Sequence, residues 1–335
     1  MRAVVYTETG DPDVLRLVER PVPEPGPGEV RVSVRVSGVN PTDWKSRRGI
    51  MYFAEQVPNQ DGAGVIDVVG PDVDASRVGQ RVWLWEAARR RPNGTAQEFV
   101  VLPARQVVAL PDDASFELGA SLGIPVLTAH RCLTVADGGP SRLRPGALDG
   151  WTVLVAGGAG AVGNAAIQLA RWAGATVVST VSSADKARLA TAAGAHHVVN
   201  YRDGDTAAAI RAVVPDGVSI VVEVAPVTNA ALNAEVLAPN GVVAIYATED
   251  SGDPVIPLED TFALNARWQG VLVYTVPTAA KDDAVAATTE ALADGAVRAG
   301  AEAGLPLHLF PLERTADAHA AVEANAVGKV LITVG

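Results

Sequence analysis

Apolar and polar residues alternate in short runs over the first third of the chain. Between residues 29 and 37 a valine stands at every second position, which is the period of a half-buried strand. Similar runs at 64–70, 81–85 and 96–102 are separated by segments that contain Pro and Gly. Short strands at this spacing predict a compact, barrel-like β domain.

The pattern changes near residue 123, where strand-like runs begin to alternate with longer helical segments. This alternation is typical of a doubly wound parallel sheet. After residue 300 the chain returns to β character, and we expect this tail to pack on the first domain. We therefore predict an α/β protein with a β-rich domain (1–122 and 301–335) and a parallel-sheet domain (123–300). Strands of the second domain are expected at 152–156, 175–181, 197–200, 218–223, 241–247 and 269–273.

A glycine-rich turn follows the first of these strands. Its glycines have the spacing G-x-G-x-x-G, which allows a tight turn, close approach of the backbone to a pyrophosphate, and close packing of helix on strand. The helix that follows presents N–H groups and a positive dipole end to phosphates. We therefore predict a dinucleotide site that uses Gly158, Gly160, Ala161, Val162 and Gly163.

The end of the second strand favours NADPH over NADH. NAD-binding folds usually place Asp or Glu about 20 residues past the first glycine, but here the strand ends in two serines. Hydroxyls and cations bind a 2′-phosphate through charge-assisted hydrogen bonds, whereas a carboxylate repels it. The alternative for the nearby lysine is an ordinary solvated charge. The candidate ligands are Ser182, Ser183, Lys186, Tyr201 and Arg202, of which Arg202 has the same alternative as the lysine.

Charge and composition exclude several other classes of protein. The net charge of -11 argues against nucleic acid or an anionic membrane as a partner, because either requires a basic surface. No segment has 18 uninterrupted apolar residues and the first residues do not resemble a signal peptide, so we expect a cytoplasmic protein. The single cysteine, Cys132, excludes an internal disulfide, and the histidines lack paired ligand spacing, so we expect no metal site.

Taken together, the motifs resemble the zinc-independent branch of the medium-chain dehydrogenase/reductase superfamily that contains the zeta-crystallin-like NADPH:quinone oxidoreductases. The resemblance implies a GroES-like catalytic domain, a Rossmann domain, NADPH in the cleft between them, and a homodimer. The matching segments are residues 38–43, 59–65, 123–131, the glycine turn, 182–186, 194–195 and 200–202.

The chain departs from the zinc alcohol dehydrogenases of this superfamily. Their three catalytic zinc ligands align with Asn40, Gln60 and Ile124; neutral amides are poor zinc ligands and isoleucine cannot ligate. Hydride transfer to an electrophilic acceptor needs no Lewis acid, and the resemblance implies reduction of a quinone. One alternative is reduction of an enone or enoyl thioester in a biosynthetic pathway. The alternative that is not an enzyme is a crystallin-type protein that binds NADPH without turnover.

The first domain holds the candidates for the chemistry. Asn40 either holds the substrate or nicotinamide through its amide, or is a turn residue before a proline. Thr42 either bonds near the nicotinamide or caps a local turn. Tyr52 resembles a tyrosine that orients substrate or donates a proton in relatives, but the spacing is off by one, so its role stays open. Asp61 either acts in catalysis or bonds local backbone or a neighbouring arginine.

Further cofactor contacts are expected at the carboxyl ends of the parallel strands, where this fold binds its ligands. The resemblance adds Thr128 at the nicotinamide amide and Lys329 near the cofactor phosphates or the cleft rim, with an ordinary surface lysine as the alternative for Lys329. The strand ends contribute Ala225, Ile245, Tyr246, Ala247, Val273 and Tyr274.

Overall fold

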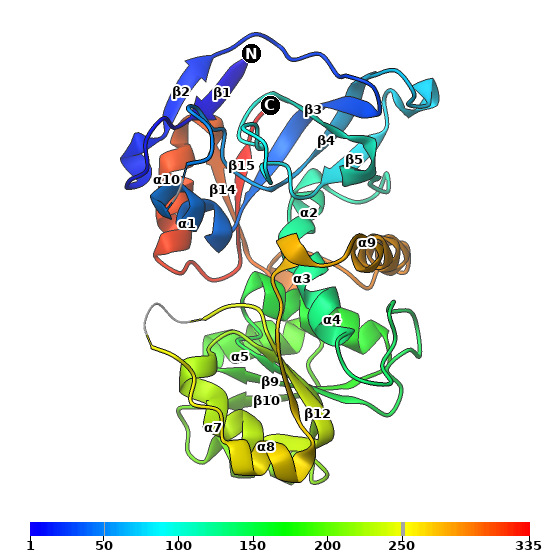
Figure 1. Ribbon diagram of the computed structural model, residues 1–335, viewed down its shortest axis with the longest axis vertical. Coiled ribbons are helices and arrows are strands. Elements are labelled where there is room, and N and C mark those ends of the chain that lie inside the picture. Colours follow the sequence, from blue (N-terminus) through cyan, green and yellow to red (C-terminus); the bar gives the residue numbers. More distant parts are fainter. Residues whose placement is uncertain (50, 249–251) are drawn as a thin grey trace. The chain divides into compact units, whose positions relative to one another are not determined.

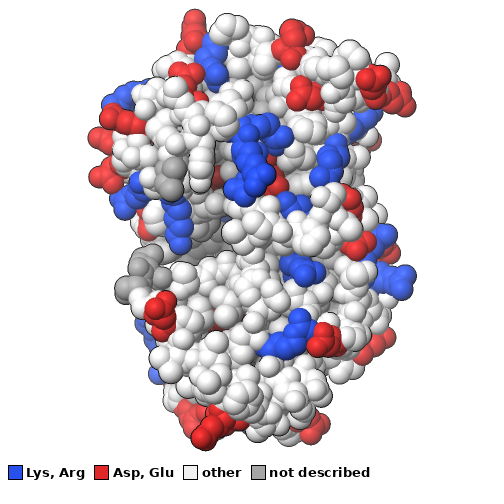
Figure 2. Space-filling model, viewed as in Figure 1, with Lys and Arg blue, Asp and Glu red and all other residues white. Residues whose placement is uncertain are grey.

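The computed structural model describes residues 1–49, 51–248 and 252–335 (Figure 1). The chain divides into two compact units. Unit 1 consists of Met1–Ile124 and Pro306–Gly335, and unit 2 consists of Pro125–Leu305. Within the described ranges, no helix is both long enough and apolar enough to cross a membrane. On the face in view, acidic and basic side chains are interspersed (Figure 2).

Unit 1 is built on a seven-stranded sheet with the order β14-β15-β3-β4-β5-β7, and β6 also pairs with β3. The central strand β3 turns Val30, Val32 and Val34 into the core. Strand β15 pairs antiparallel with β3 and parallel with β14, so the tail joins this sheet. Strands β1 and β2 form a separate pair. The bounds are β1 (Arg2–Val5), β2 (Arg16–Glu19), β3 (Glu29–Val39), β4 (Asp61–Val69), β5 (Arg81–Leu84), β6 (Phe99–Pro103), β7 (Val107–Ala109), β14 (Leu307–Pro311) and β15 (Lys329–Thr333).

Short helices accompany this sheet. Helix α1 begins immediately after the corner at which β3 ends, and α10 packs against α1, β14 and β15. Helix α3 contains the boundary between the two units. The bounds are α1 (Pro41–Gly49), α2 (Phe116–Gly119), α3 (Gly123–Leu133) and α10 (Thr315–Glu323).

Unit 2 has a six-stranded parallel sheet with the order β10-β9-β8-β11-β12-β13. The chain runs outward from β8 to one edge and then returns to β11 on the other side of β8. This reversal creates a switch point at the carboxyl ends of β8 and β11, where open α/β sheets bind ligands. The strands are β8 (Thr152–Ala156), β9 (Thr176–Val181), β10 (His197–Asn200), β11 (Val218–Glu223), β12 (Leu237–Ile245) and β13 (Arg267–Gly270). The helices are α4 (Ala161–Trp172), α5 (Ala184–Ala193), α6 (Thr206–Val213), α7 (Pro226–Val236), α8 (Leu258–Leu264) and α9 (Thr278–Ala293).

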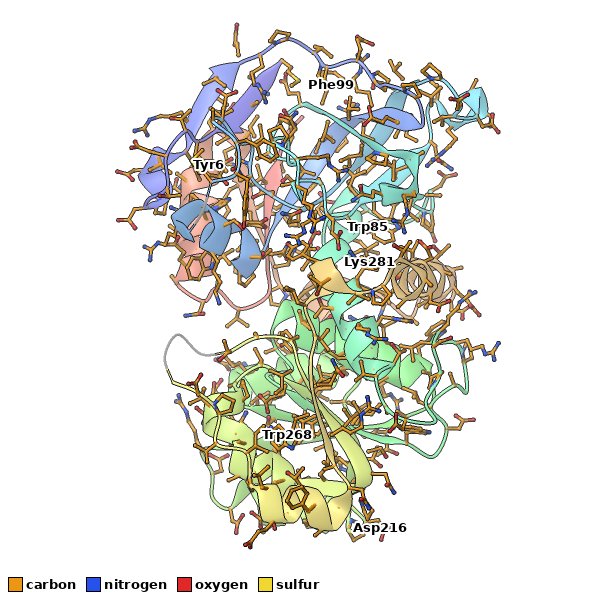
Figure 3. The ribbon with its side chains drawn as sticks, viewed as in Figure 1. Tyr6, Trp85, Phe99, Asp216, Trp268 and Lys281 are labelled. Carbon is orange, nitrogen blue, oxygen red and sulfur yellow. The ribbon has the colours of Figure 1, made fainter. Side chains whose placement is uncertain are left out.

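The last two strands of unit 2 end earlier than the sequence predicts. The final pair in their ladder joins Ile245 to Gly270. Beyond this pair the Val271 N–H still donates to the Ile245 carbonyl at 2.7 Å, and the chain then leaves the sheet. Val273 and Tyr274 therefore lie in a 3₁₀ turn, Val273–Thr275, and the predicted strand at 269–273 is wrong in its second half. Side-chain packing continues beside the sheet, where Trp268 of β13 donates to Thr261 of α8 at 3.2 Å (Figure 3).

Candidate functional site

In the glycine turn of unit 2, two glycines are required by the packing of the fold and a third is not. A Cβ at Gly158 would collide with the Ser179 hydroxyl, and one at Gly163 would collide with the carbonyl of Gly157. At Gly160 the nearest atom to such a Cβ is the Gly157 carbonyl oxygen, 3.5 Å away. Gly158 and Gly163 thus allow helix and strand to pack closely, whereas Gly160 leaves open space beside the turn.

The first turn of α4 supplies the donors at this open space. Gly160 is the N-cap, with an extended φ of -84°, and among the described residues no side chain caps it. The backbone N–H groups of Ala161, Val162 and Gly163 are therefore the ones that the helix itself cannot use. Together with the positive end of the helix dipole, they form a site suited to a phosphate group.

Three of the predicted 2′-phosphate ligands lie together at the carboxyl end of β9. Lys186 Nζ donates to Ser182 Oγ at 3.0 Å, and Ser183 Oγ accepts from the Lys186 backbone N–H at 3.3 Å as the N-cap of α5. The first acidic residue, Asp185, points into solvent and pairs with Arg188. This corner therefore combines two hydroxyls with an ammonium group, and Tyr201 lies half-exposed after the adjacent strand β10.

A buried carboxylate that the sequence analysis missed orders the end of β11. Glu223 is fully buried and accepts from the backbone N–H of Ala225 at 2.6 Å and from Asn233 Nδ2 at 2.6 Å. Its backbone carbonyl accepts from the Tyr246 N–H at 3.1 Å. Burial and this carboxylate raise the pKa of the Tyr246 hydroxyl. The sequence does contain a signal for this buried carboxylate, because a single acid ends an apolar strand shortly before a proline.

The remaining residues predicted to contact the cofactor are distributed over the same unit. Tyr274 accepts from Lys281 Nζ through its carbonyl at 3.4 Å (Figure 3). Thr128 is buried in α3, Ile245, Tyr246 and Ala247 lie at the end of β12, and Val273 and Tyr274 lie in the 3₁₀ turn.

In unit 1, Asn40 is buried at the corner between β3 and α1 and uses its polar groups within the protein. Its backbone N–H donates to Asp43 Oδ2 at 2.7 Å, which closes a capping interaction at the start of α1. Its side-chain Nδ2 donates to Asp61 Oδ2 at 2.7 Å, and its Oδ1 accepts from Lys329 Nζ at 2.6 Å. Thr42 lies in the first turn of the same helix.

Asp61 is the centre of this cluster. It is 0 % exposed, and its second oxygen, Oδ1, accepts from the Ile124 backbone N–H at 2.8 Å. Lys329 Nζ lies 3.4 Å from Oδ2. A Cβ at Gly123 would collide with the Asp61 carboxylate, and one at Gly38 would collide with a backbone carbonyl beside it. These two glycines make room for the acid, which bonds distant backbone and a lysine rather than an arginine.

The charges in this cluster depend on one another. Burial raises the pKa of Asp61 and lowers that of Lys329, and each group counteracts the shift in the other. Burial, together with the negative charge of Asp61, raises the pKa of Asp43 to about 8. Asp61 and Lys329 therefore form an ion pair, while Asp43 holds a proton at neutral pH.

A chain of side-chain hydrogen bonds leads through the core to the backbone of Asp61. Thr95 Oγ1 donates to the Asp61 carbonyl at 2.5 Å and lies 2.7 Å from Ser37 Oγ. Asn59 Nδ2 donates to Ser37 Oγ at 2.9 Å, and Asn59 Oδ1 lies 3.0 Å from His319 Nε2. Because Thr95 and Asn59 fix the donors, Ser37 donates to Thr95 and His319 carries its proton on Nε2. Every donor in the chain thus points toward Asp61.

Two predicted residues take positions that the sequence did not indicate. Lys329, expected near the cofactor phosphates, at the cleft rim or on the surface, is 1 % exposed and belongs to the Asn40–Asp61 cluster, so the surface alternative is wrong. Tyr52 lies outside the cluster, is 74 % exposed, and donates its backbone N–H to Gln56 Oε1 at 2.9 Å.

The residues at the three aligned zinc-ligand positions do not fit zinc. Asn40 and Ile124 direct N–H groups, not lone pairs, at Asp61, and the Gln60 side-chain oxygen accepts from a backbone N–H at 3.1 Å. An ammonium group, that of Lys329, already accompanies the carboxylate. No group of three or more His, Cys, Asp or Glu side chains in the described part of the chain could hold a metal. The polarity of this cluster suits an oxygen that accepts hydrogen bonds.

Known proteins resemble this chain over almost its whole length. Residues 26–112 match the family model of the alcohol dehydrogenase GroES-like domain, and residues 161–290 match that of the zinc-binding dehydrogenases. Quinone oxidoreductase from Homo sapiens is 30% identical over 343 residues, which cover 99% of this chain and 97% of the relative.

Two solved structures share the fold. A mycobacterial protein in complex with NADPH superposes with a TM-score of 0.82 at 30% identity, covering 99% of this chain and 100% of that chain. An NAD-dependent alcohol dehydrogenase superposes with a TM-score of 0.86 at 29% identity, covering 100% of both chains.

Proposed function

Because this chain belongs to the zeta-crystallin-like quinone oxidoreductase family of the medium-chain dehydrogenase/reductase superfamily, we propose that it reduces a quinone without zinc. It is an NADPH-dependent oxidoreductase. The observation that carries the proposal is the environment of Asn40. This residue stands at an aligned ligand position, but Asp61 and Lys329 hold it as a hydrogen-bond donor.

Unit 2 is the part of the chain that we assign to NADPH, and residues 1–122 with 301–335 form the substrate domain in this proposal. The first turn of α4 binds the pyrophosphate with its backbone N–H groups. Ser182, Ser183 and Lys186 bind the 2′-phosphate, because their hydroxyls and ammonium group lie together at the end of β9. The mycobacterial neighbour with the same fold was solved with NADPH.

The chemistry follows from the charge that develops on the acceptor. NADPH, when bound, would supply a hydride; its addition to a quinone would leave a negative charge on a former carbonyl oxygen, and one proton taken from water would complete the hydroquinone. Asn40 Nδ2 carries two hydrogens and Asp61 accepts one of them. The second hydrogen donates to the oxyanion, and a donor held in place before the reaction stabilises such charge strongly.

Oxidation of a simple alcohol is disfavoured by the same groups. That reaction requires a Lewis acid or a base to lower the pKa of the alcohol. The buried donors around Asp61 provide neither, because the carboxylate is occupied by Asn40, Ile124 and Lys329. An acceptor that is already electrophilic, such as a quinone, needs only orientation and stabilisation of the oxyanion.

The proposal is tested by initial rates of NADPH oxidation with 1,4-benzoquinone, an enone, an enoyl thioester and a simple aldehyde, each with and without a chelator. We expect turnover of the quinone that the chelator does not change. Selective turnover of the enone or thioester would place the protein among C=C reductases. Loss of activity with chelator would contradict the zinc-free route, and NADPH binding without turnover of any acceptor would contradict the enzymatic assignment.

A further inference from the structure

The amide of Asn40 is held from both ends by charged groups of opposite sign. Asp61 Oδ2 accepts from Nδ2 at 2.7 Å, and Lys329 Nζ donates to Oδ1 at 2.6 Å. All three side chains are at most 3 % exposed, so water does not replace either partner. Bonds to ionised partners in a buried site are strong and directional.

These partners permit only one orientation of the amide. A rotation by 180° would bring the Asn40 oxygen against the Asp61 carboxylate and its NH₂ group against the Lys329 ammonium. Both contacts would join like groups in a site without water, which is costly. The second hydrogen of Nδ2 therefore keeps a fixed direction, which is the requirement for a donor that acts without reorganisation.

Lys329 also determines the charge that surrounds this donor. Asp61 alone would place a buried negative charge next to the group that must stabilise an oxyanion, and like charges repel strongly where the dielectric constant is low. The ammonium group lies 3.4 Å from the carboxylate and neutralises it. The acids and bases that face Lys329 are Asp61 and Asp43, and Asp43 holds a proton at neutral pH.

We propose that Lys329 is a positioning residue for the reaction, which fixes Asn40 as the oxyanion donor and neutralises Asp61 where related enzymes carry a metal. The inference rests on the proposed function. It differs from the expectation that Lys329 binds cofactor phosphates, because here Lys329 acts through Asn40 and contacts neither substrate nor cofactor.

The test compares Lys329→Met, Asn40→Leu and the double variant in the full-length protein. We expect Lys329→Met to lower kcat for the best quinone about 10- to 100-fold, somewhat less than loss of an oxyanion donor. The Kd for NADPH, measured by fluorescence, should stay within about twofold. In the Asn40→Leu background, loss of Lys329 should lower kcat by no more than about twofold more, because the residues act as one unit.

Arg47→Met is the matched control. Arg47 is a second fully buried cation of unit 1, and it bonds the Gly10 carbonyl and Glu323 rather than Asn40. It should destabilise the fold to a similar extent and leave kcat unchanged. If Lys329→Met does not fold, Lys329→Gln takes its place, because it removes the charge and keeps a donor. A raised Kd for NADPH with kcat intact, or losses that multiply in the double variant, would overturn the proposal.

A second measurement does not require turnover. 4-Nitrophenol is titrated against the complex with NADP⁺, and its absorbance reports whether phenol or phenolate is bound. The wild type should lower the pKa of bound nitrophenol, and Lys329→Met should abolish this shift. A wild type that reduces no quinone but prefers phenolate would contradict the proposed function alone. An equal pKa shift of nitrophenol in both proteins, or no preference for phenolate in the wild type, would overturn the role of Lys329.

Discussion

The Lys186 ammonium donates to the Ser182 hydroxyl at 3.0 Å, so the cation is held at the end of β9 before any ligand binds. A charge-assisted hydrogen bond contributes roughly 1.5–3 kcal/mol. Lys186→Ala should therefore weaken NADPH by about this amount and leave NADH almost unchanged. Calorimetric titration with both cofactors measures the difference, and Arg188→Ala, two residues further along α5 and facing solvent, serves as the control. Equal losses for both cofactors would exclude a 2′-phosphate site here.

Gly160→Ala separates cofactor binding from folding. A Cβ at this position has its nearest neighbour 3.5 Å away and the backbone φ is -84°, so the substitution should cost less than about 1 kcal/mol of unfolding free energy. The added methyl group would occupy the space into which we expect the pyrophosphate to fit. The larger side chain of Gly160→Val would fill this space and should abolish binding of NADPH and NADH alike. Gly163→Ala is the contrasting variant, because its Cβ would collide with backbone and destabilise the fold. Full NADPH affinity in Gly160→Val would mean that the turn is structural only.

Asp43 should make unit 1 less stable as the pH rises. Its pKa is about 8 in the folded protein, raised by burial from an ordinary value near 3.8, so the unfolded chain releases this proton first. The stabilising contribution is fully present below pH 4, falls between pH 4 and 8, and changes no further above that range. Each pKa unit corresponds to ~1.4 kcal/mol. Asp43→Asn should therefore gain stability relative to wild type over this window. Urea unfolding at pH 5, 7 and 9 measures the gain, and a constant difference would contradict the assignment.

His319 should have the opposite pH dependence. Burial lowers its pKa to about 3 from an ordinary value of 6.5, so its neutral form stabilises the fold above pH 6.5 and this contribution is lost as the pH falls toward 3. His319→Gln retains a donor for Asn59 and removes the titration. The variant should lose less stability than wild type between pH 6.5 and 4. If the unfolding free energies of the two proteins fall in parallel as the pH is lowered, His319 is not buried as a neutral base.

Local patterns were sufficient to predict the parallel sheet. The strands at 152–156, 197–200 and 218–223 are confirmed with the same bounds, because each is a short, valine-rich segment between helical segments. The glycine turn was predictable for the same reason, since spacing within six residues determines its geometry. The ends of β12 and β13 were not, because they depend on where the partner strand stops.

The buried cluster of unit 1 was only partly predictable. Asn40 was identified from its aligned position, but its partner Lys329 lies 289 residues further along the chain. In the sequence, Asp43 resembles an ordinary acidic residue in the first turn of a helix. Only the pairing of β15 with β3 brings the lysine to the corner where Asn40 stands. Periodicity carries no information on such a contact, so the charge balance of the site could be recognised only in the structure.

The route of the chain through the two units has a consequence for synthesis. Unit 2 is one continuous segment, 125–305, whereas unit 1 needs β14 and β15, which lie after residue 306. On the ribosome the sheet around β3 is therefore incomplete while unit 2 already has its whole sequence, and domains fold as their chain emerges. Until β15 arrives, Asp61 has no lysine beside it, and burying it without that partner is costly. The order of translation thus completes the sequence of unit 2 before the strands that surround Asn40 can all pair.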